Sequence, residues 1–140
     1  MLPSPHRLRL SSDFRAVMRS GVRAGRPCCV VHALAHEPDV ERTSGPRFGL
    51  VVSKAVGNSV VRHRMSRRLR HICAEVASGE YFDIDFVVRA LPPAVDADPE
   101  RLRAEVIGAA ERAAAKARRR LPDTPGTVAA ARSGNSPNRD

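Results

Sequence analysis

Aromatic residues are scarce in this chain. Its 140 residues include four phenylalanines, one tyrosine and no tryptophan, so few rings are available on which the bases of a single-stranded nucleic acid could stack. Cysteine is scarce too: there are three, Cys28, Cys29 and Cys73, without Cys-x-x-Cys spacing. An odd count without that spacing argues against a disulfide framework and against a zinc site. We therefore expect buried free thiols.

Long apolar runs are absent as well. No stretch approaches the roughly 20 apolar residues of a membrane-spanning helix, and the N-terminal MLPSPHRLRL lacks the apolar core of a secretory signal. Free thiols then predict a cytoplasmic protein without a membrane partner. With 42% hydrophobic residues the chain can bury a small core. We expect one domain over residues 1–121 and, because residues 122–140 are rich in proline, glycine and serine, a disordered tail there.

Acidic side chains are outnumbered by basic ones. The chain has 24 lysines and arginines against 15 acids, a net charge of +9 and a pI near 11.1. That balance indicates a polyanionic partner, with nucleic acid ahead of an acidic membrane surface. Lys54 and Lys116 are the only lysines. A GC-rich genome explains the preference for arginine over lysine, but not the excess of positive charge.

The positive charge is concentrated in residues 57–72, GNSVVRHRMSRRLRHI, which hold five arginines, two histidines and no acid. Val61, Met65, Leu69 and Ile72 recur at helical spacing, which predicts a helix from about residue 59 to 76 with one apolar stripe. Each pair of like charges a turn apart costs roughly 0.2–0.5 kcal/mol, and Glu75 is the only acid within the helix. A bound polyanion would compensate for this repulsion.

Patterns elsewhere predict the element order α-β-β-α-β-α, with room for one more short strand. The helices before and after the basic one are expected at 11–20, capped by Ser11, Ser12 or Asp13 and ended by Gly21, and at 99–120, capped by Asp98. Strands are expected at 28–34, 47–53 and 82–90. The first two could pair as a hairpin. A helix between two strands indicates a crossover, and so a mixed sheet with helices packed on it.

The arrangement favours RNA over a DNA major groove, because no second helix precedes the basic helix at a short turn, as a helix-turn-helix requires. A basic helix beside a sheet suits structured or single-stranded RNA. Phe14 is the best candidate for base stacking, since its helix lies near the basic N-terminal Arg7 and Arg9. Core packing is the alternative role for Phe14.

Two stretches resemble a known family. Residues 48–72, FGLVVSKAVGNSVVRHRMSRRLRHI, and residues 7–21, RLRLSSDFRAVMRSG, resemble the signature of the protein subunit of bacterial ribonuclease P. That family has a strand ending in Ser-Lys, a Gly-Asn turn and a helix opening with Arg-Asn-Arg. Its first helix carries Asp-Phe and ends at glycine. The resemblance spans about residues 6–118.

The resemblance implies an α/β sandwich of the α+β class, similar to the second domain of a ribosomal protein of the small subunit. The basic helix would lie in a left-handed β-α-β crossover, an exception to the usual handedness. The holoenzyme removes the 5′ leader of precursor tRNA. Catalysis would belong to the RNA subunit and its Mg²⁺, with no catalytic residue on the protein. One monomeric protein would bind each ribonuclease P RNA, contact the leader and strengthen Mg²⁺ and substrate binding.

The resemblance also assigns site residues. Those expected to bind the RNA subunit are Lys54, Asn58, Arg62, His63, Arg64, Arg67, Arg68 and Arg70. Those expected in a leader-binding cleft are Phe14, Met18 and His32. The chain departs from the family pattern where His63 replaces an asparagine and where Ala55 and Ser66 replace common lysines. Met18 and His32 stand where other members carry aromatics, which implies a weaker or differently tuned leader contact.

Three other functions fit parts of the sequence. The nearest is a ribosomal or general structured-RNA-binding protein. A pull-down that identifies the bound RNA as ribosomal RNA or as ribonuclease P RNA would distinguish it from the ribonuclease P subunit. An enzyme in its own right could use His32, His63, His71, Asp83 and Asp85, the two aspartates being spaced for Mg²⁺ on one strand face. RNA cleavage by the isolated chain would reveal it. A membrane-surface amphipathic helix is the third, and vesicle flotation would reveal it.

Overall fold

The structure is a computed structural model that describes Leu8 and residues 11–36, 46–79, 81 and 83–120. The predicted tail at 122–140 and Phe82 of the third predicted strand lie outside these residues. In chain order the elements are α1 (Ser11–Ser20), β1 (Val22–Gly25), β2 (Cys29–Ala35), β3 (Arg47–Val51), α2 (Ser59–Ala77), β4 (Ile84–Ala90), the 3-10 helix η2 (Pro92–Asp96) and α3 (Pro99–Arg120).

The four strands form one mixed sheet in the order β1-β2-β4-β3. β2 is antiparallel to β1 and β4, whereas β3 and β4 are parallel. The predicted α+β class, with a helix crossing between two strands of a mixed sheet, is therefore confirmed. The left-handedness of the crossover and the likeness to the ribosomal domain stay predictions.

The predicted hairpin between 28–34 and 47–53 is wrong, because β4 lies between these two strands. β4 is suited to the interior of the sheet: Ile84, Phe86, Val87 and Val88 are all fully buried. A strand that is apolar on both faces is typical of a central position covered on both sides. The alternating pattern of 47–53 shows only that it is a strand, and its partner depends on where α2 returns the chain.

Sequence patterning left β1 unassigned. This strand is four residues long and only Ala24 is buried, so it carries almost no apolar signal. It pairs with β2 from Val22↔Ala33 to Gly25↔Val30. The turn closes where the Arg26 amide donates to the Cys29 carbonyl over 2.7 Å. β1 thus forms one edge of the sheet.

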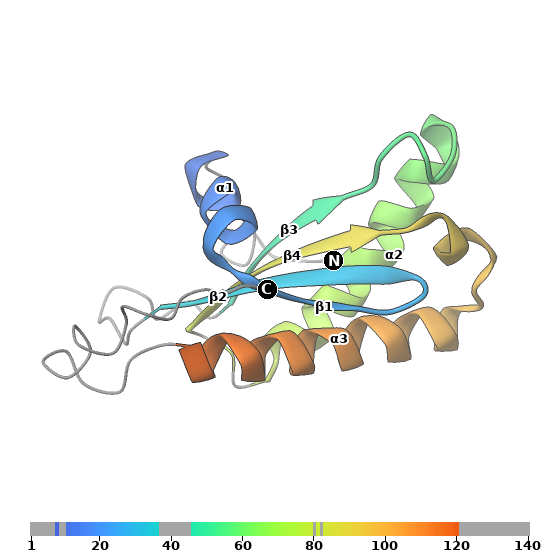
Figure 1. Cartoon of the computed structure of the whole chain (residues 1–140). Coiled ribbons are helices and arrows are strands. Elements are labelled where there is room, and N and C mark those ends of the chain that lie inside the picture. The colour runs from blue at the N-terminus through green and yellow to red at the C-terminus, as the bar shows by residue number, and fades with distance from the viewer. Residues whose placement is uncertain (1–7, 9–10, 37–45, 80, 82, 121–140) are drawn as a thin grey trace, which may run out of the picture.

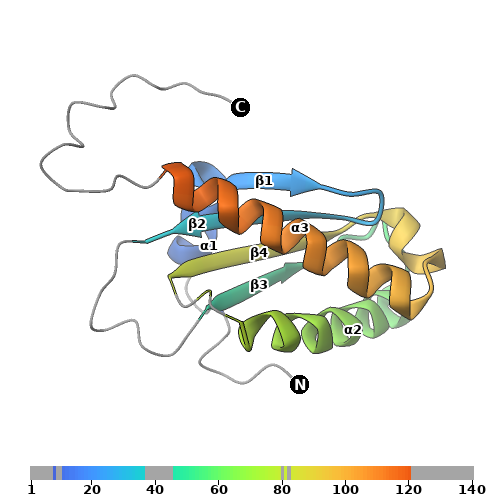
Figure 2. The same ribbon diagram turned by 90° about the horizontal axis from the view of Figure 1, so that it is seen from below.

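Helices cover both faces of the sheet (Figure 1). α2 and α3 lie side by side on one face (Figure 2), and α1 lies on the other. The core lies between the sheet and the α2–α3 layer, where Phe48 stacks on Phe86 with ring centroids 5.0 Å apart. α3 approaches the sheet closely because its buried stripe is mostly alanine: Ala109, Ala110, Ala113, Ala114 and Ala117 beside Leu102 and Val106.

Candidate RNA-binding surfaces

The basic helix α2 is divided into an apolar side and a cationic side. Met65 and Leu69, 2% and 0% exposed, enter the core with Ile72, Cys73 and Val76. The predicted apolar stripe is therefore used to hold the helix on the sheet, which removes the face that a membrane-surface helix would need. On the other side His63, Arg64 and Arg67 are exposed, and Arg62, Arg68 and Arg70 are half-buried. The aliphatic stems of the half-buried arginines can lie along apolar neighbours while their charges stay in water.

None of the ion pairs among the described residues neutralises this cationic side. The carboxylates of Asp13, Asp83, Asp85 and Glu105 pair with arginines outside α2. Arg62 makes its hydrogen bond to the Gly57 carbonyl, at 3.2 Å, instead of to a carboxylate. The guanidinium groups at 62, 64, 67, 68 and 70 therefore keep their charge available to an external anion.

The only acid of α2 is directed to another helix. Glu75 accepts hydrogen bonds from Nε of Arg103 on α3, at 2.9 Å from each carboxylate oxygen, and also pairs with Nη2 of the same residue. These hydrogen bonds lower the pKa of Glu75. Glu75 consequently joins α2 to α3 at the far end of the helix and leaves the first four turns without a negative charge.

The start of α2 explains two residues of the signature. The side chain of Asn58 caps the helix, since its Oδ1 accepts the Val61 amide at 3.0 Å. A Cβ on Gly57 would lie 2.8 Å from Cγ1 of Val61, so glycine is required there by close approach. Lys54 is exposed in the turn before the helix. The structure thus gives Asn58 a capping role in addition to the RNA contact predicted for it.

The second surface is the α1 face of the sheet, which we define by the strand residues that alternate away from the core: Arg23, Val30, His32, Leu34, Arg47, Gly49, Asp85, Val87 and Arg89. The predicted residue Phe14 lies directly on this face. A Cβ on Gly49 would be 2.6 Å from Cε2 of Phe14, so the ring rests against bare backbone of β3. Neighbouring Val17 is fully buried, whereas Met18 is 38% exposed at the surface of α1.

His32 lies two strands away from Gly49 in the same row of the sheet, through Val87. It is only 7% exposed, and its Nε2 is the one buried side-chain nitrogen or oxygen of the described residues without a hydrogen-bond partner. Burial, followed by the charges of Arg23 and Arg89, lowers its pKa, so the ring is neutral near pH 7. Leaving such a group unpaired costs about 1–3 kcal/mol, which a ligand on this face would relieve.

An ionic network whose partners no local sequence pattern predicts holds α1 on the sheet. Arg47 donates from Nε and Nη2 to the two oxygens of buried Asp85, at 3.0 and 2.8 Å, and its Nη1 reaches Asp13 of α1 at 3.3 Å. Nε2 of His36 lies 2.9 Å from the same Asp85 carboxylate. The hydrogen bonds to Asp85 raise the pKa of Arg47. An acid within an apolar strand was the available signal, because such a group requires a cationic partner.

The same contacts argue against a Mg²⁺ site on Asp83 and Asp85. Asp83 pairs with Arg118 of α3, at 3.0 Å from Nε and 2.6 Å from Nη2, while Asp85 is held by Arg47. Across the described ranges no group of three or more His, Cys, Asp or Glu side chains is placed to hold a metal ion. No described helix is long and apolar enough to cross a bilayer.

The fold and the cationic side of α2 define an α+β RNA-binding protein. A family model described as Ribonuclease P matches residues 2–114. The ribonuclease P protein component of Corynebacterium diphtheriae is 51% identical over 114 residues, covering 80% of this chain and 96% of that protein. The corresponding protein of Rhodococcus opacus is 50% identical over 108 residues, covering 76% and 86%. The chain therefore belongs to the ribonuclease P protein family.

Solved structures agree with this assignment at the level of the fold. The ribonuclease P protein of Staphylococcus aureus superimposes with a TM-score of 0.65 at 23% identity, covering 77% of this chain and 94% of that one. The protein from Thermotoga maritima gives 0.62 at 23%, covering 73% and 92%. Members of the family are the protein subunit of a tRNA-processing ribonucleoprotein enzyme. The family supports this function over a general RNA-binding role.

Proposed function

We propose that the cationic side of α2, with Lys54 and Asn58, binds the ribonuclease P RNA. The observation that carries this proposal is that five arginines of one helix have no carboxylate partner among the described residues, while Glu75, the acid of the same helix, is paired with Arg103 of α3. Phosphates would supply the missing negative charge, and the release of condensed counterions would favour binding. The apolar side of α2 is buried in the core, and this fixes the direction in which the five arginines of the cationic side point.

The α1 face binds the 5′ leader of precursor tRNA in this proposal. Phe14 offers part of a ring next to the sheet, Met18 offers an exposed thioether, and His32 offers an unpaired ring nitrogen. Stacking of a base on an aromatic group is worth about 1–3 kcal/mol. With Met18 and His32 in place of rings, hydrogen bonding at His32 would replace part of that stacking.

The RNA subunit performs the chemistry, and the Mg²⁺ ions that it needs are held mainly by RNA. This division is supported by the ion-paired state of Asp83 and Asp85. One monomeric protein serves each RNA, in the cytoplasm. By contacting the leader phosphates, the protein strengthens binding of the substrate, and we expect stronger Mg²⁺ binding in the same complex.

The RNA contact is tested by substituting Arg67→Ala or Arg70→Ala and measuring affinity for the RNA subunit across a salt series. Each lost phosphate contact should flatten the log–log slope by roughly 0.7–0.9. Arg101→Ala is the matched control, because it removes the same charge from a residue already paired with Glu105 at 3.0 Å. A slope that is unchanged in both α2 variants would exclude these residues from the interface.

Function is tested by 5′-end processing of a precursor tRNA by the RNA subunit at low Mg²⁺, with and without the chain. At low Mg²⁺ we expect the RNA subunit to cleave at the mature 5′ end much faster with the chain than without it, or to cleave there only when the chain is present. A general RNA-binding protein would bind the RNA without this rescue, and a protein enzyme would cleave without the RNA subunit.

A further inference from the structure

β1 forms the edge of the sheet opposite the edge on which α2 lies (Figure 2). A second row of unpaired cations runs along this β1 edge. We call it the edge stripe and define it as Arg23 and Arg26, from β1 and its turn, with Arg112, Lys116 and Arg119 of α3. All are exposed except Lys116, which is half-buried. None of them takes part in an ion pair within the described part of the chain.

The stripe is continuous because β1 and α3 are fastened together along it. Lys116 donates from Nζ to the Arg23 carbonyl at 3.0 Å. The guanidinium of Arg26 lies against Gly108, where a Cβ would come within 3.1 Å of Nη2. Gly108, Arg112, Lys116 and Arg119 follow one another at spacings of four, four and three, so they lie on one side of the helix.

Ordinary helix electrostatics explain only part of this row. Cations in the last turn stabilise the C-terminal carbonyls of a helix, which accounts for Arg119. That effect does not extend to Arg112, two turns earlier, or to Arg23 and Arg26 outside the helix. Asp98 caps the first turn of α3 and Glu105 pairs with Arg101. Glu111, which precedes Arg112, lines a pocket with Val76, Tyr81 and Arg118 and forms no ion pair with the stripe in the described part of the chain. The stripe therefore carries repulsion that an external anion would relieve.

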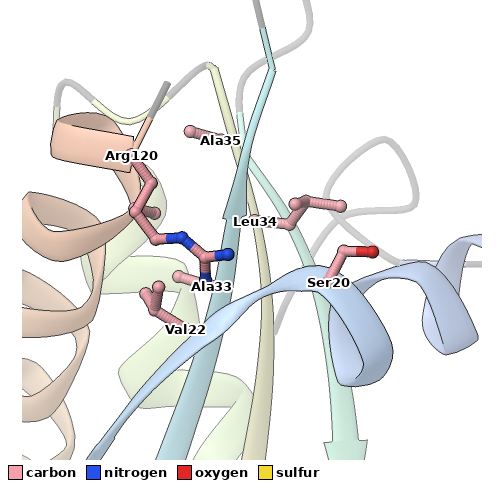
Figure 3. Close-up of a pocket in the computed structure, with 7 residues that line it drawn as sticks. Ser20, Val22, Ala33, Leu34, Ala35 and Arg120 are labelled. Carbon is pink, nitrogen blue, oxygen red and sulfur yellow. The ribbon is translucent and has the colours of Figure 1, made fainter. Parts of the chain in front are cut away.

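The stripe begins where the α1 face ends. In strand register, Gly49 beneath Phe14 is followed across the sheet by Val87, His32 and Arg23. A small hollow marks the same edge (Figure 3): Ser20 at the end of α1 faces it from one side, and Arg120 extends its guanidinium beside Val22 and Ala33 from the other. The α1 face thus leads to the stripe without an intervening wall of acidic side chains.

We propose that the edge stripe binds the backbone of single-stranded RNA that leaves the α1 face, namely the distal part of the precursor tRNA leader. This inference rests on the leader contact of the proposed function. Three strand spacings separate Gly49 from Arg23, roughly 14 Å, which about four nucleotides span if the strand keeps the 3.4 Å rise that it has in a stacked duplex. From Gly108 to Arg119 the stripe adds roughly 16 Å, so nucleotides beyond about the fourth are the ones that reach it.

The test uses the holoenzyme assembled from the RNA subunit and the full chain, with two precursor tRNAs that carry leaders of about four and about twelve nucleotides. The variant is Arg112→Ala combined with Arg119→Ala, two exposed positions outside the core, and Arg101→Ala is the control. We expect wild type and control to bind the long leader more tightly, with a steeper salt dependence. The double variant should lose that gain, its slope flattening by roughly 1.4 for two contacts to a single strand, and should bind the short leader as wild type does.

Equal losses on both leaders would overturn the inference and assign the stripe to the RNA subunit or the tRNA body. Equal binding of the long leader by variant and wild type would also overturn it. Affinity for the RNA subunit is measured in parallel. A wild-type chain that binds no RNA subunit would overturn the proposed function and this inference together. Intact binding without the leader-length effect would overturn this inference alone.

Discussion

Gly49 and Phe14 give the sharpest test of how α1 is placed on the sheet. A methyl group at position 49 would lie 2.6 Å from Cε2 and 2.8 Å from Cδ2 of Phe14, closer than carbon atoms can approach. Gly49 is in the middle of β3 and pairs with Val87, so alanine fits the backbone and the collision with the ring is the main cost. Overpacking of this kind destabilises by about 1–3 kcal/mol.

Phe14→Ala removes the other member of the pair. A fully buried phenylalanine loses about 3–5 kcal/mol on truncation to alanine, and roughly half of that applies here because the ring is half-buried. With the ring gone, the methyl group of Gly49→Ala occupies vacated space. We therefore expect the double variant to be no less stable than Phe14→Ala alone, which corresponds to a coupling energy of about 1–3 kcal/mol.

Urea unfolding of the wild type, both single variants and the double variant measures this coupling through the midpoint at constant m-value. Binding supplies a second readout. Phe14→Ala and Gly49→Ala should both weaken the binding of precursor tRNA more than the binding of mature tRNA, because both substitutions disturb the α1 face. Additive stability losses would show that the ring does not rest on Gly49. Equal losses for precursor and mature tRNA would limit Phe14 to packing.

Substitutions at three further positions test structural roles, and those at Asn58 also test an RNA contact. Asp85→Asn should destabilise the protein by about 3 kcal/mol, because it leaves Arg47 without its buried partner, whereas Asp83→Asn, which breaks the more exposed pair with Arg118, should cost about 1 kcal/mol or less in the same urea experiment. Asn58→Ala should lower stability by about 1 kcal/mol through loss of the cap, and Asn58→Ser should restore it. RNA affinity that recovers fully with serine would show that Asn58 acts through the helix, and affinity that stays low would show a direct amide contact.

The sequence predicts the elements of this fold better than their neighbours. Helical spacing at Met65, Leu69 and Ile72 identifies the buried side of α2 because periodicity depends on a single helix. The cap at Asp98 is equally local, and the Arg101 amide donates to it at 2.8 Å. Strand order is a property of the whole chain, and for this reason the predicted hairpin between 28–34 and 47–53 is wrong.

In the candidate site, too, local features can be predicted from the sequence and contacts between distant residues cannot. The cationic side of α2 can be derived from one stretch of sequence, and the structure adds that Glu75, the acid of that helix, pairs with Arg103 of α3. The contact between Phe14 and Gly49 joins residues 35 positions apart, and the link from Arg47 to Asp85 joins residues 38 apart. No local pattern encodes such pairs. The family signature locates Phe14, and only the fold explains why glycine lies beneath it.

The central place of β4 has a consequence for how the chain acquires its shape during synthesis. β1 and β2 emerge first and can form a hairpin, but β3 has no neighbour in the sheet until β4, later in sequence than α2, inserts between it and β2. A nascent chain that ends before residue 84 therefore has the β1–β2 pair, and β3 still lacks its partner in the sheet. The cationic helix α2 then has no complete sheet on which to pack. Such non-local closure is slow compared with local pairing. The RNA binding that we propose for α2 would then require that β4 has been synthesised, because β4 completes the sheet on which α2 packs.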